Sequence, residues 1–133
     1  MAKKYPLYRC PKCGNIVEML KAGSCVPTCC GEPMEELVQN PTDDPAVLKK
    51  HQLSVVEDDG NDIVKIGAMG HPMKKDHYIE WVEIISACGA VHRRHLNPGD
   101  EPESWFLPPA EHVHSIRAYC SQHGLWEKNW PEE

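Results

Sequence analysis

Cysteine and histidine are the residues of this sequence best suited to chemistry, and they fall into two groups. Residues 1–37 hold five of the seven cysteines and no histidine. Residues from about 50 onward hold all eight histidines and the other two cysteines. Thiolate sulfur and imidazole nitrogen are ligands of zinc and iron. The distribution predicts metal ligation in both halves of the chain, with different donors in each.

The first group contains a metal-binding knuckle, Cys10-Pro11-Lys12-Cys13-Gly14. Two intervening residues let both thiolates face one ion, and the glycine permits a tight turn. A second pair, Cys29-Cys30-Gly31, follows about fifteen residues later. Together the pairs supply four thiolates, which suit tetrahedral zinc or iron. A zinc ribbon is the simplest interpretation of the first pair, but the adjacent cysteines of the second predict a distorted tetrahedron.

The second group is scattered, and a lone histidine is more often a surface or hydrogen-bonded residue than a ligand. Two local arrangements favour ligation. His71-Pro72-Met73 follows a glycine-containing turn, with His77 six residues later. Cys120-Ser121-Gln122-His123-Gly124 ends a predicted strand and is typical of a ligand pair on a turn.

Strands are expected to position these residues. Apolar or alternating runs predict strands at 53–56, 63–66, 78–85 and 113–120, with a turn at 58–61 and a short helix at 45–50. Alternation along 113–120 places His114, Ile116, Ala118 and Cys120 on one face, and Val113, Ser115, Arg117 and Tyr119 on the other. Several short strands at this spacing favour an all-β sandwich or barrel.

Composition also predicts the domain boundaries. Residues 1–37 are too few to form a stable hydrophobic core alone and are expected to need further stabilisation, such as a bound metal. The polar, proline-containing segment 38–49 is predicted to be a linker, and 50–133 a β-domain.

Charge and hydropathy exclude several function classes. The formal net charge of -6 argues against a nucleic-acid partner, because such binding depends on Lys and Arg at the phosphates. No apolar run is long enough to span a membrane, and no secretory signal is evident. The cysteines are therefore expected in a reducing cytoplasm, where metal ligation is a better default than disulfides.

Several motifs together resemble a known family. The four-cysteine segment resembles desulforedoxin, which holds one iron in four cysteines. His71-Pro72-Met73, His77, Tyr78-Ile79-Glu80-Trp81, Leu96-Asn97-Pro98-Gly99-Asp100 and Tyr119-Cys120-Ser121-Gln122-His123-Gly124-Leu125-Trp126 resemble superoxide reductase. In this order, across residues 5 to 128, they resemble desulfoferrodoxin, the two-iron form of superoxide reductase.

The resemblance implies two mononuclear iron ions and an immunoglobulin-like β-sandwich after the desulforedoxin-like domain. The ligands of the first iron would be Cys10, Cys13, Cys29 and Cys30. Those of the second would be His51, His71, His77 and His123 in the equatorial plane and Cys120 as the axial thiolate. The sixth position would stay open for superoxide, which ferrous iron would reduce to hydrogen peroxide. Lys50 would attract the anion and help organise protonating water.

The chain departs from the family pattern beside the first histidine. Lys49 stands where the family has a glutamate that occupies the sixth position of the oxidised iron. The oxidised centre is therefore expected to be five-coordinate or to take water or hydroxide. Lys74 and Lys75 also replace acidic residues, so Lys49, Lys50, Lys74 and Lys75 are expected to form a positive rim.

The resemblance also implies partners: superoxide, a rubredoxin-like electron donor and a second copy of the chain. The alternatives are a non-enzymatic iron electron carrier and a zinc-ribbon protein with a structural β-domain. Outside both ligand sets, Cys25 is expected to be a spare thiol and Cys88 a partly buried one. His92 and His95 are expected to be solvated, and His112 and His114 to be structural.

Overall fold

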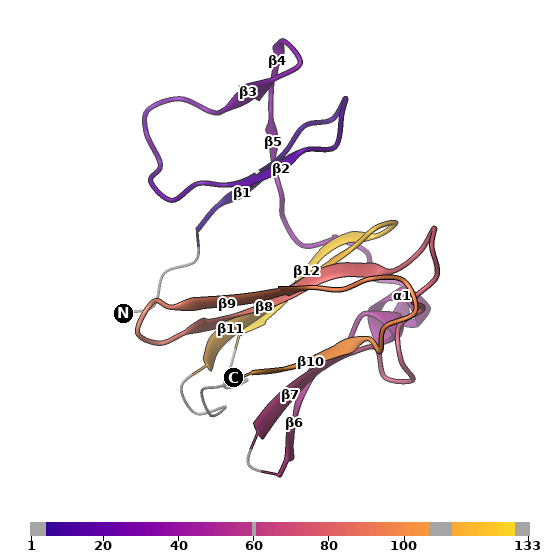
Figure 1. Cartoon of the computed structure of the whole chain (residues 1–133). Coiled ribbons are helices and arrows are strands. Elements are labelled where there is room, and N and C mark those ends of the chain that lie inside the picture. Colours follow the sequence, from indigo (N-terminus) through magenta and orange to yellow (C-terminus); the bar gives the residue numbers. More distant parts are fainter. Residues whose placement is uncertain (1–4, 60, 107–112, 130–133) are drawn as a thin grey trace. The chain divides into compact units, whose positions relative to one another are not determined.

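Short antiparallel strands and one short helix make up the regular structure of the described chain. The computed structural model describes residues 5–59, 61–106 and 113–129. The chain divides into two compact units, with the boundary between Val38 and Gln39. Figure 1 shows the elements of both units. Each unit contains one of the two groups of candidate ligands.

The first unit is built from very short strands. Three of them, β1 (Leu7–Arg9), β2 (Ile16–Glu18) and β5 (Glu35–Glu36), form a sheet in the order β2-β1-β5. A two-stranded hairpin joins β3 (Thr28–Cys29) to β4 (Glu32–Pro33). The buried hydrophobic residues described in this unit are Leu7, Cys10 and Met34. So small a core needs a further source of stability, and a metal ion would provide one.

The second unit is a β-sandwich. One sheet has the order β12-β11-β8-β9 and contains Gly124–Asn129, Val113–Cys120, Ile79–Ser86 and Val91–His95. The other has the order β10-β7-β6 and contains Glu103–Phe106, Asn61–Ile66 and Leu53–Asp58. All pairings within these sheets are antiparallel. The predicted all-β class, with an immunoglobulin-like sandwich, is confirmed.

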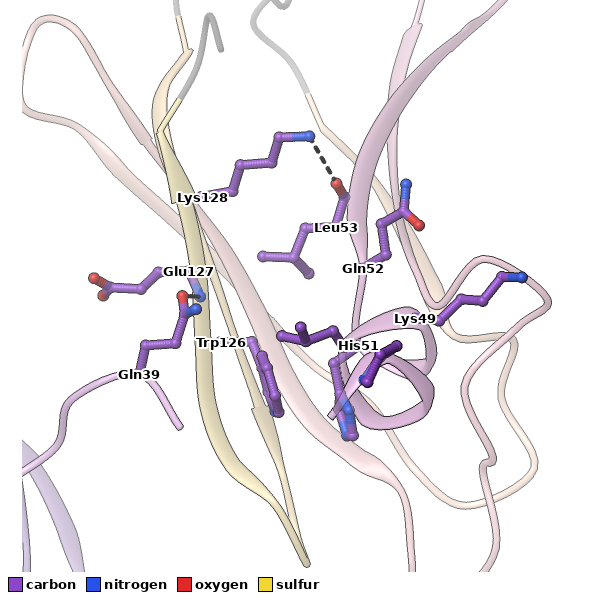
Figure 2. A pocket seen from close by; sticks show the side chains of 10 residues that line it. Gln39, Lys49, His51, Gln52, Leu53, Trp126, Glu127 and Lys128 are labelled. Carbon is purple, nitrogen blue, oxygen red and sulfur yellow. Dashed lines mark hydrogen bonds between the residues drawn. The ribbon is translucent and has the colours of Figure 1, made fainter. Parts of the chain in front are cut away.

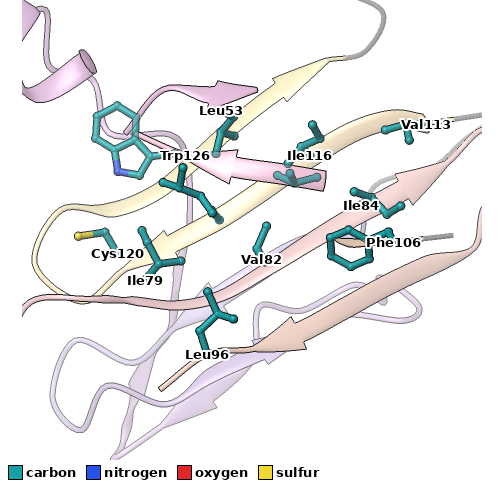
Figure 3. Packing of buried hydrophobic residues seen from close by; sticks show 13 residues of the cluster. Leu53, Ile79, Val82, Ile84, Leu96, Phe106, Val113, Ile116, Cys120 and Trp126 are labelled. Carbon is teal, nitrogen blue, oxygen red and sulfur yellow. The ribbon is translucent and has the colours of Figure 1, made fainter. Parts of the chain in front are cut away.

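The core lies between the two sheets. Leu53, Val64 and Phe106 come from the three-stranded sheet and meet Val82, Ile84, Ile116 and Ala118 from the four-stranded one. In Figure 3, Trp126 and Cys120 lie at one end of this cluster, and Val113 and Phe106 lie at the other. The sandwich core therefore extends to the thiol that was expected to bind metal.

The helix α1 spans Pro45–Lys50, as the sequence predicted. Asp44 caps its N-terminus by accepting a hydrogen bond from the Ala46 N–H at 2.9 Å, and Pro45 occupies the first turn. Lys49 and Lys50 lie in the last turn, where positive charge complements the helix dipole. His51 is the C-cap, so the helix end fixes the first histidine.

The predicted strands also form, with one local difference. The alternation predicted for 113–120 places Val113 opposite the core, yet Val113 packs within it. The pairing of β11 with β8 shifts between Val113 and Ser115, and this irregularity reverses the direction of the side chain.

One buried acid interrupts the apolar run of β8. Glu83 is 0 % exposed, and each of its carboxylate oxygens binds a different arginine. The Nε and Nη2 atoms of Arg93 lie 2.8 and 2.7 Å from Oε1, and those of Arg117 lie 2.7 and 2.6 Å from Oε2. Two N–H donors on each oxygen, from two positively charged arginines, make a buried carboxylate tolerable in this sheet.

Candidate metal centres

Two tight turns bring the four cysteines of the first unit together. The turn after β1 is closed by a 3.0 Å hydrogen bond from the Gly14 N–H to the Cys10 carbonyl. Cys30 and Gly31 form the two-residue loop of the β3-β4 hairpin, with φ angles of 54° and 77°. Two positive φ values are the signature of a type I′ turn. The adjacent cysteines are thus explained: one ends a strand, and the next begins its turn.

The spacing of the four sulfurs fits a metal ion. All four lie within 4.8 Å of one another. The Cys13 and Cys29 sulfurs are 3.6 Å apart, and those of Cys29 and Cys30 are 3.9 Å apart. A tetrahedron with metal–sulfur bonds of about 2.3 Å has edges of about 3.8 Å. The turns therefore hold the thiols at nearly the separation that a bound ion requires.

The pKa values of these thiols also indicate that a cation is needed for all four to ionise. The Cys13 N–H, 3.5 Å from the Cys10 sulfur, is the main cause that lowers the pKa of Cys10 to about 6. Hydrogen bonds to neighbouring sulfurs, chiefly that of Cys13, raise the pKa of Cys29 and raise that of Cys30 to about 12. One thiolate forms readily, whereas further negative charge needs a positive ion among the sulfurs.

The second cluster is assembled from four segments of the sandwich unit. His51 ends α1, and His71 follows a turn that leaves β7. His77 closes a turn through reciprocal backbone hydrogen bonds with Lys74, at 2.9 and 3.0 Å. Cys120 ends β11, and His123 lies in the turn before β12.

Gly67 allows the first two of these segments to meet. Its φ is +90°, and a Cβ there would lie 2.6 Å from the His71 backbone nitrogen and 2.7 Å from the Lys50 carbonyl oxygen. Any side chain would force the segments apart. Glycine at this position therefore lets the end of α1 approach the backbone of His71.

The side chains of the cluster converge on one point. The Nε2 atoms of His51 and His71 are 3.1 Å apart, and the latter is 3.3 Å from the Cys120 sulfur. The ligand atoms of His51, His71, His77 and Cys120 lie within 4.8 Å of one another. His123 joins them, since its Nδ1 is 3.7 Å from the Cys120 sulfur and its ring centroid is 5.1 Å from that of His77.

The hydrogen bonds behind the rings show that this cluster fits a metal. The Nδ1 atoms of His51 and His71 lie 2.8 and 2.6 Å from the carbonyl oxygens of Val47 and Pro72. A carbonyl only accepts, so each Nδ1 carries the hydrogen and each Nε2 presents a lone pair. Two lone pairs face each other at 3.1 Å, and a cation bound by both relieves their repulsion.

Burial keeps the imidazoles neutral. It is the main cause that lowers the pKa of His51, of His77, and of His71 to about 4. The Nε2 atom of His77 is also buried without a hydrogen-bond partner. The neutral imidazoles, including the unpaired Nε2 of His77, can each donate a lone pair to a metal ion. With His123 and Cys120, five donors converge, one more than structural zinc sites use.

The lysines around the cluster divide into two sets. The positive charges of Lys50 and Lys74 contribute, after burial, to the lowered pKa of His77, and Lys50 acts likewise on His51. Lys49 instead lines a pocket on another side of His51. The charges of Lys50 and Lys74 therefore act at the cluster, and Lys49 lines a pocket that His51 also lines.

The remaining cysteines and histidines lie outside both clusters. Cys25 is a free, exposed thiol. Cys88 is exposed, contrary to the expectation of partial burial, because it lies in the turn after β8. His92 and His95 belong to the edge strand β9, and His95 is exposed. His114 is partly buried with an unpaired Nδ1, and His112 lies outside the described residues.

Sequence reasoning missed the groups that hold the ligands in place. Trp126 stacks on His51, and the carbonyls of Val47 and Pro72 orient two rings. The four-residue spacing of Val47 and His51 across a predicted helix was a usable signal for the first carbonyl. In the other centre, the side-chain amide of Asn15 lies 3.7 Å from the Cys29 sulfur and donates to it.

Comparison with known proteins places both centres in one family. Residues 45–129 match the desulfoferrodoxin family model, and residues 2–37 match the model of the desulfoferrodoxin N-terminal domain. The chain belongs to the desulfoferrodoxin family. Its four-cysteine cluster and its cluster of four histidines and one cysteine are the two iron centres of this family.

Individual relatives share nearly the whole family architecture. A desulfoferrodoxin homolog of Archaeoglobus fulgidus is 44% identical over 96% of this chain and 98% of its own length. The desulfoferrodoxin of Nitratidesulfovibrio vulgaris is 42% identical over the same shares. The crystal structure of the superoxide reductase from Treponema pallidum matches with a TM-score of 0.75 at 22% identity. That match covers 97% of this chain and all of the other, and it supports the shared fold.

Proposed function

We propose that this desulfoferrodoxin is a superoxide reductase that converts superoxide to hydrogen peroxide and is re-reduced by a rubredoxin-like protein. One observation carries the proposal: four imidazoles and one thiolate converge on a single point within a mostly buried cluster. Bound iron would supply one electron at this point. The solved neighbour's description as a superoxide reductase supports this activity.

The donor set suits the reaction by its charge. Four neutral imidazoles and one thiolate place one negative charge on the metal, and thiolate ligation pushes electron density toward the other ligand positions. The backbone carbonyls behind His51 and His71 hold their rings in the ligating tautomer. Such support raises ligand basicity and fixes orientation. These residues keep the centre assembled through each turnover.

Lys50 has the role of attracting the substrate. Superoxide is an anion and the chain carries a net charge of -6, so local positive charge must guide its approach. Lys50 is exposed at the end of α1, and its charge acts on both His51 and His77. Lys74 adds to the field at His77. Lys50 also supplies positive charge beside the water that delivers protons to the product.

The four-cysteine iron has a different role from the reacting centre. Four thiolates complete a tetrahedral site and leave no position for a substrate. We assign it to electron relay and to stabilising the small first unit, in a homodimer that works in the cytoplasm. Among the described residues, the helix is too short to cross a membrane.

Rapid mixing tests the proposed activity directly. Protein loaded with two irons per chain and reduced beforehand is mixed with superoxide. We expect one equivalent of the histidine-bound iron to oxidise and an equivalent of hydrogen peroxide to form. A reduced protein that superoxide leaves unoxidised would be an electron carrier, and zinc in place of both irons would make the protein a structural zinc protein.

A further inference from the structure

A pocket opens beside the histidine centre on the side occupied by α1. It has a volume of about 620 Å³ and is lined by Gln39, Pro45, Leu48, Lys49, His51, Gln52, Leu53, Trp126, Glu127 and Lys128. Figure 2 shows His51 and Trp126 side by side in its wall. His51 is the one ligand of the described cluster among these residues. The pocket therefore reaches the metal centre through a single ligand.

That ligand is well placed to connect the pocket with the metal. The indole of Trp126 lies flat against the His51 imidazole, with centroids 4.3 Å apart and planes at 9°. The Nε2 of the same imidazole faces His71 and the rest of the cluster. His71 and Cys120 are 3 % and 0 % exposed. The His51 imidazole therefore lines the pocket and also contacts the buried donor His71.

The surface of the pocket combines apolar and positive groups. Leu48 is 39 % exposed, and Pro45 beside it is also exposed. Lys49 and Lys128 bring two positive charges against the one negative charge of Glu127. This local balance opposes the net charge of -6 carried by the whole chain. Small interfaces with complementary charge are typical of transient electron-transfer complexes.

We propose that a small acidic one-electron carrier protein docks over this pocket and reduces the histidine-bound iron through Trp126 and His51. The carrier loses one electron, the ferric ion becomes ferrous, and no bond is made or broken. The inference rests on the proposed function, because a superoxide reductase must be re-reduced after each turnover. It assigns the carrier to the face of Lys49 and Lys128.

This face is distinct from the one assigned to superoxide. Neither Lys50, Lys74 nor His77 is among the residues that line the pocket. Lys49 and Lys50 diverge because successive helical residues project about 100° apart. A carrier bound at the pocket therefore leaves the approach of superoxide open. Reduction by the carrier and oxidation by superoxide can then alternate without the two partners competing for one surface.

Charge reversal tests the docking face by kinetics. A reduced acidic rubredoxin is mixed with the oxidised two-iron protein at low salt. We expect Lys128→Glu to lower the second-order rate of electron transfer at least fivefold, and addition of Lys49→Ala to lower it further. Alanine is used at position 49 because a glutamate there could bind the oxidised iron. The matched control is Lys65→Glu, at an exposed position on the outer face of β7. Equal effects of Lys128→Glu and Lys65→Glu would overturn the proposal.

Cross-linking provides a readout that does not depend on turnover. A carbodiimide joins lysine amines to carboxylates in contact with them, and mass spectrometry identifies the joined residues. With the same rubredoxin, we expect links at Lys49 and Lys128 that disappear at high salt. Links confined to Lys50 and Lys74 would show that the carrier uses the superoxide face and would refute the proposal.

The two hypotheses fail in different ways. Superoxide oxidation of the pre-reduced wild type tests the proposed function without any carrier. If superoxide fails to oxidise it while the Lys128→Glu effect and the cross-links persist, the docking face is supported and the reductase activity is refuted. If oxidation proceeds but the rubredoxin reacts equally with Lys128→Glu and with wild type, only the docking face is refuted.

Discussion

The indole of Trp126 lies flat against the imidazole of His51, with ring centroids 4.3 Å apart and an interplanar angle of 9°. Trp126 is part of the sandwich core, and His51 belongs to the metal cluster. The Val47 carbonyl holds the same imidazole at Nδ1. The orientation of this ligand therefore depends on the packing of the core as well as on the helix that presents it.

Replacing Trp126 should therefore affect both stability and the metal centre. Loss of a buried aromatic side chain costs about 3–5 kcal/mol, and we expect Trp126→Ala to lose about this much in denaturant titration. Trp126→Phe should retain the stacked ring and most of the stability. The visible spectrum of the histidine-bound iron should change more in the alanine variant than in the phenylalanine variant. Identical spectra would show that the stack does not orient His51.

The lysines beside His77 should control the rate with superoxide. Removal of one unit charge at about 4 Å in water changes an interaction by about 1 kcal/mol, or roughly fivefold in rate. We expect Lys50→Ala and Lys74→Ala to slow oxidation of the reduced protein by up to this factor. Rates for the wild type should fall as salt increases, and the variants should show a smaller slope. Lys65→Ala is the control, and a salt-independent wild type would contradict steering.

Removal of the metals should unfold the two units to different extents. Chelation should abolish the structure of residues 5–38, because few side chains are buried there and metal binding contributes folding energy. The sandwich should keep its strands, since its core spans both sheets. Amide NMR spectra of the metal-free protein should lose dispersion for residues 5–38 only. Dispersed signals from that segment would show that it folds without a metal.

Asn15 should tune the four-cysteine iron. Its side-chain amide donates to the Cys29 sulfur across 3.7 Å. Hydrogen bonds to ligating sulfur stabilise the more negative, reduced state. We expect Asn15→Leu to lower the reduction potential of this centre, and Asn15→Ser, with a shorter donor, to have a smaller effect. A redox titration followed at the absorbance of the four-cysteine iron would show an unchanged potential if the contact is not maintained.

Cys88 should be the thiol that alkylates at unusually low pH. The hydroxyl of Ser86, 3.1 Å from its sulfur, is the main cause that lowers the pKa of Cys88. A lowered pKa means more thiolate below the usual midpoint of about 8.5, and thiolate is the reactive form. In a Cys25→Ser background with both metals bound, iodoacetamide labelling should rise at a lower pH than for a free thiol. Ser86→Ala should move the profile upward.

The sequence predicted the ligands because most of them occur in local motifs. Cys10 and Cys13, or Cys120 and His123, are close enough in the chain for one turn to bring them together. The helix 45–50 and the strand 113–120 were predicted with the observed bounds, since capping residues and alternation are also local signals. Family resemblance then linked motifs that local patterns could not connect.

The remaining features depend on contacts between distant segments. The stack of Trp126 on His51 and the pairing of Glu83 with two arginines require the folded sheets. Val113 faces the core because of an irregularity in strand pairing, which alternation alone cannot predict. Lys49 and Lys50 are neighbours in the sequence, but only Lys49 is among the residues that line the pocket beside His51.

The backbone at Gly67 fixes the spacing between the segments that carry His51 and His71. The atoms that would meet a Cβ at this position belong to the backbone of His71 and Lys50, so they cannot yield as a flexible side chain would. Main-chain contact, rather than side-chain packing, therefore sets how closely His51 and His71 approach each other. Because main-chain atoms set this spacing, it should change little when one bound ion replaces another. The centre should therefore select metals by ionic radius as well as by ligand chemistry.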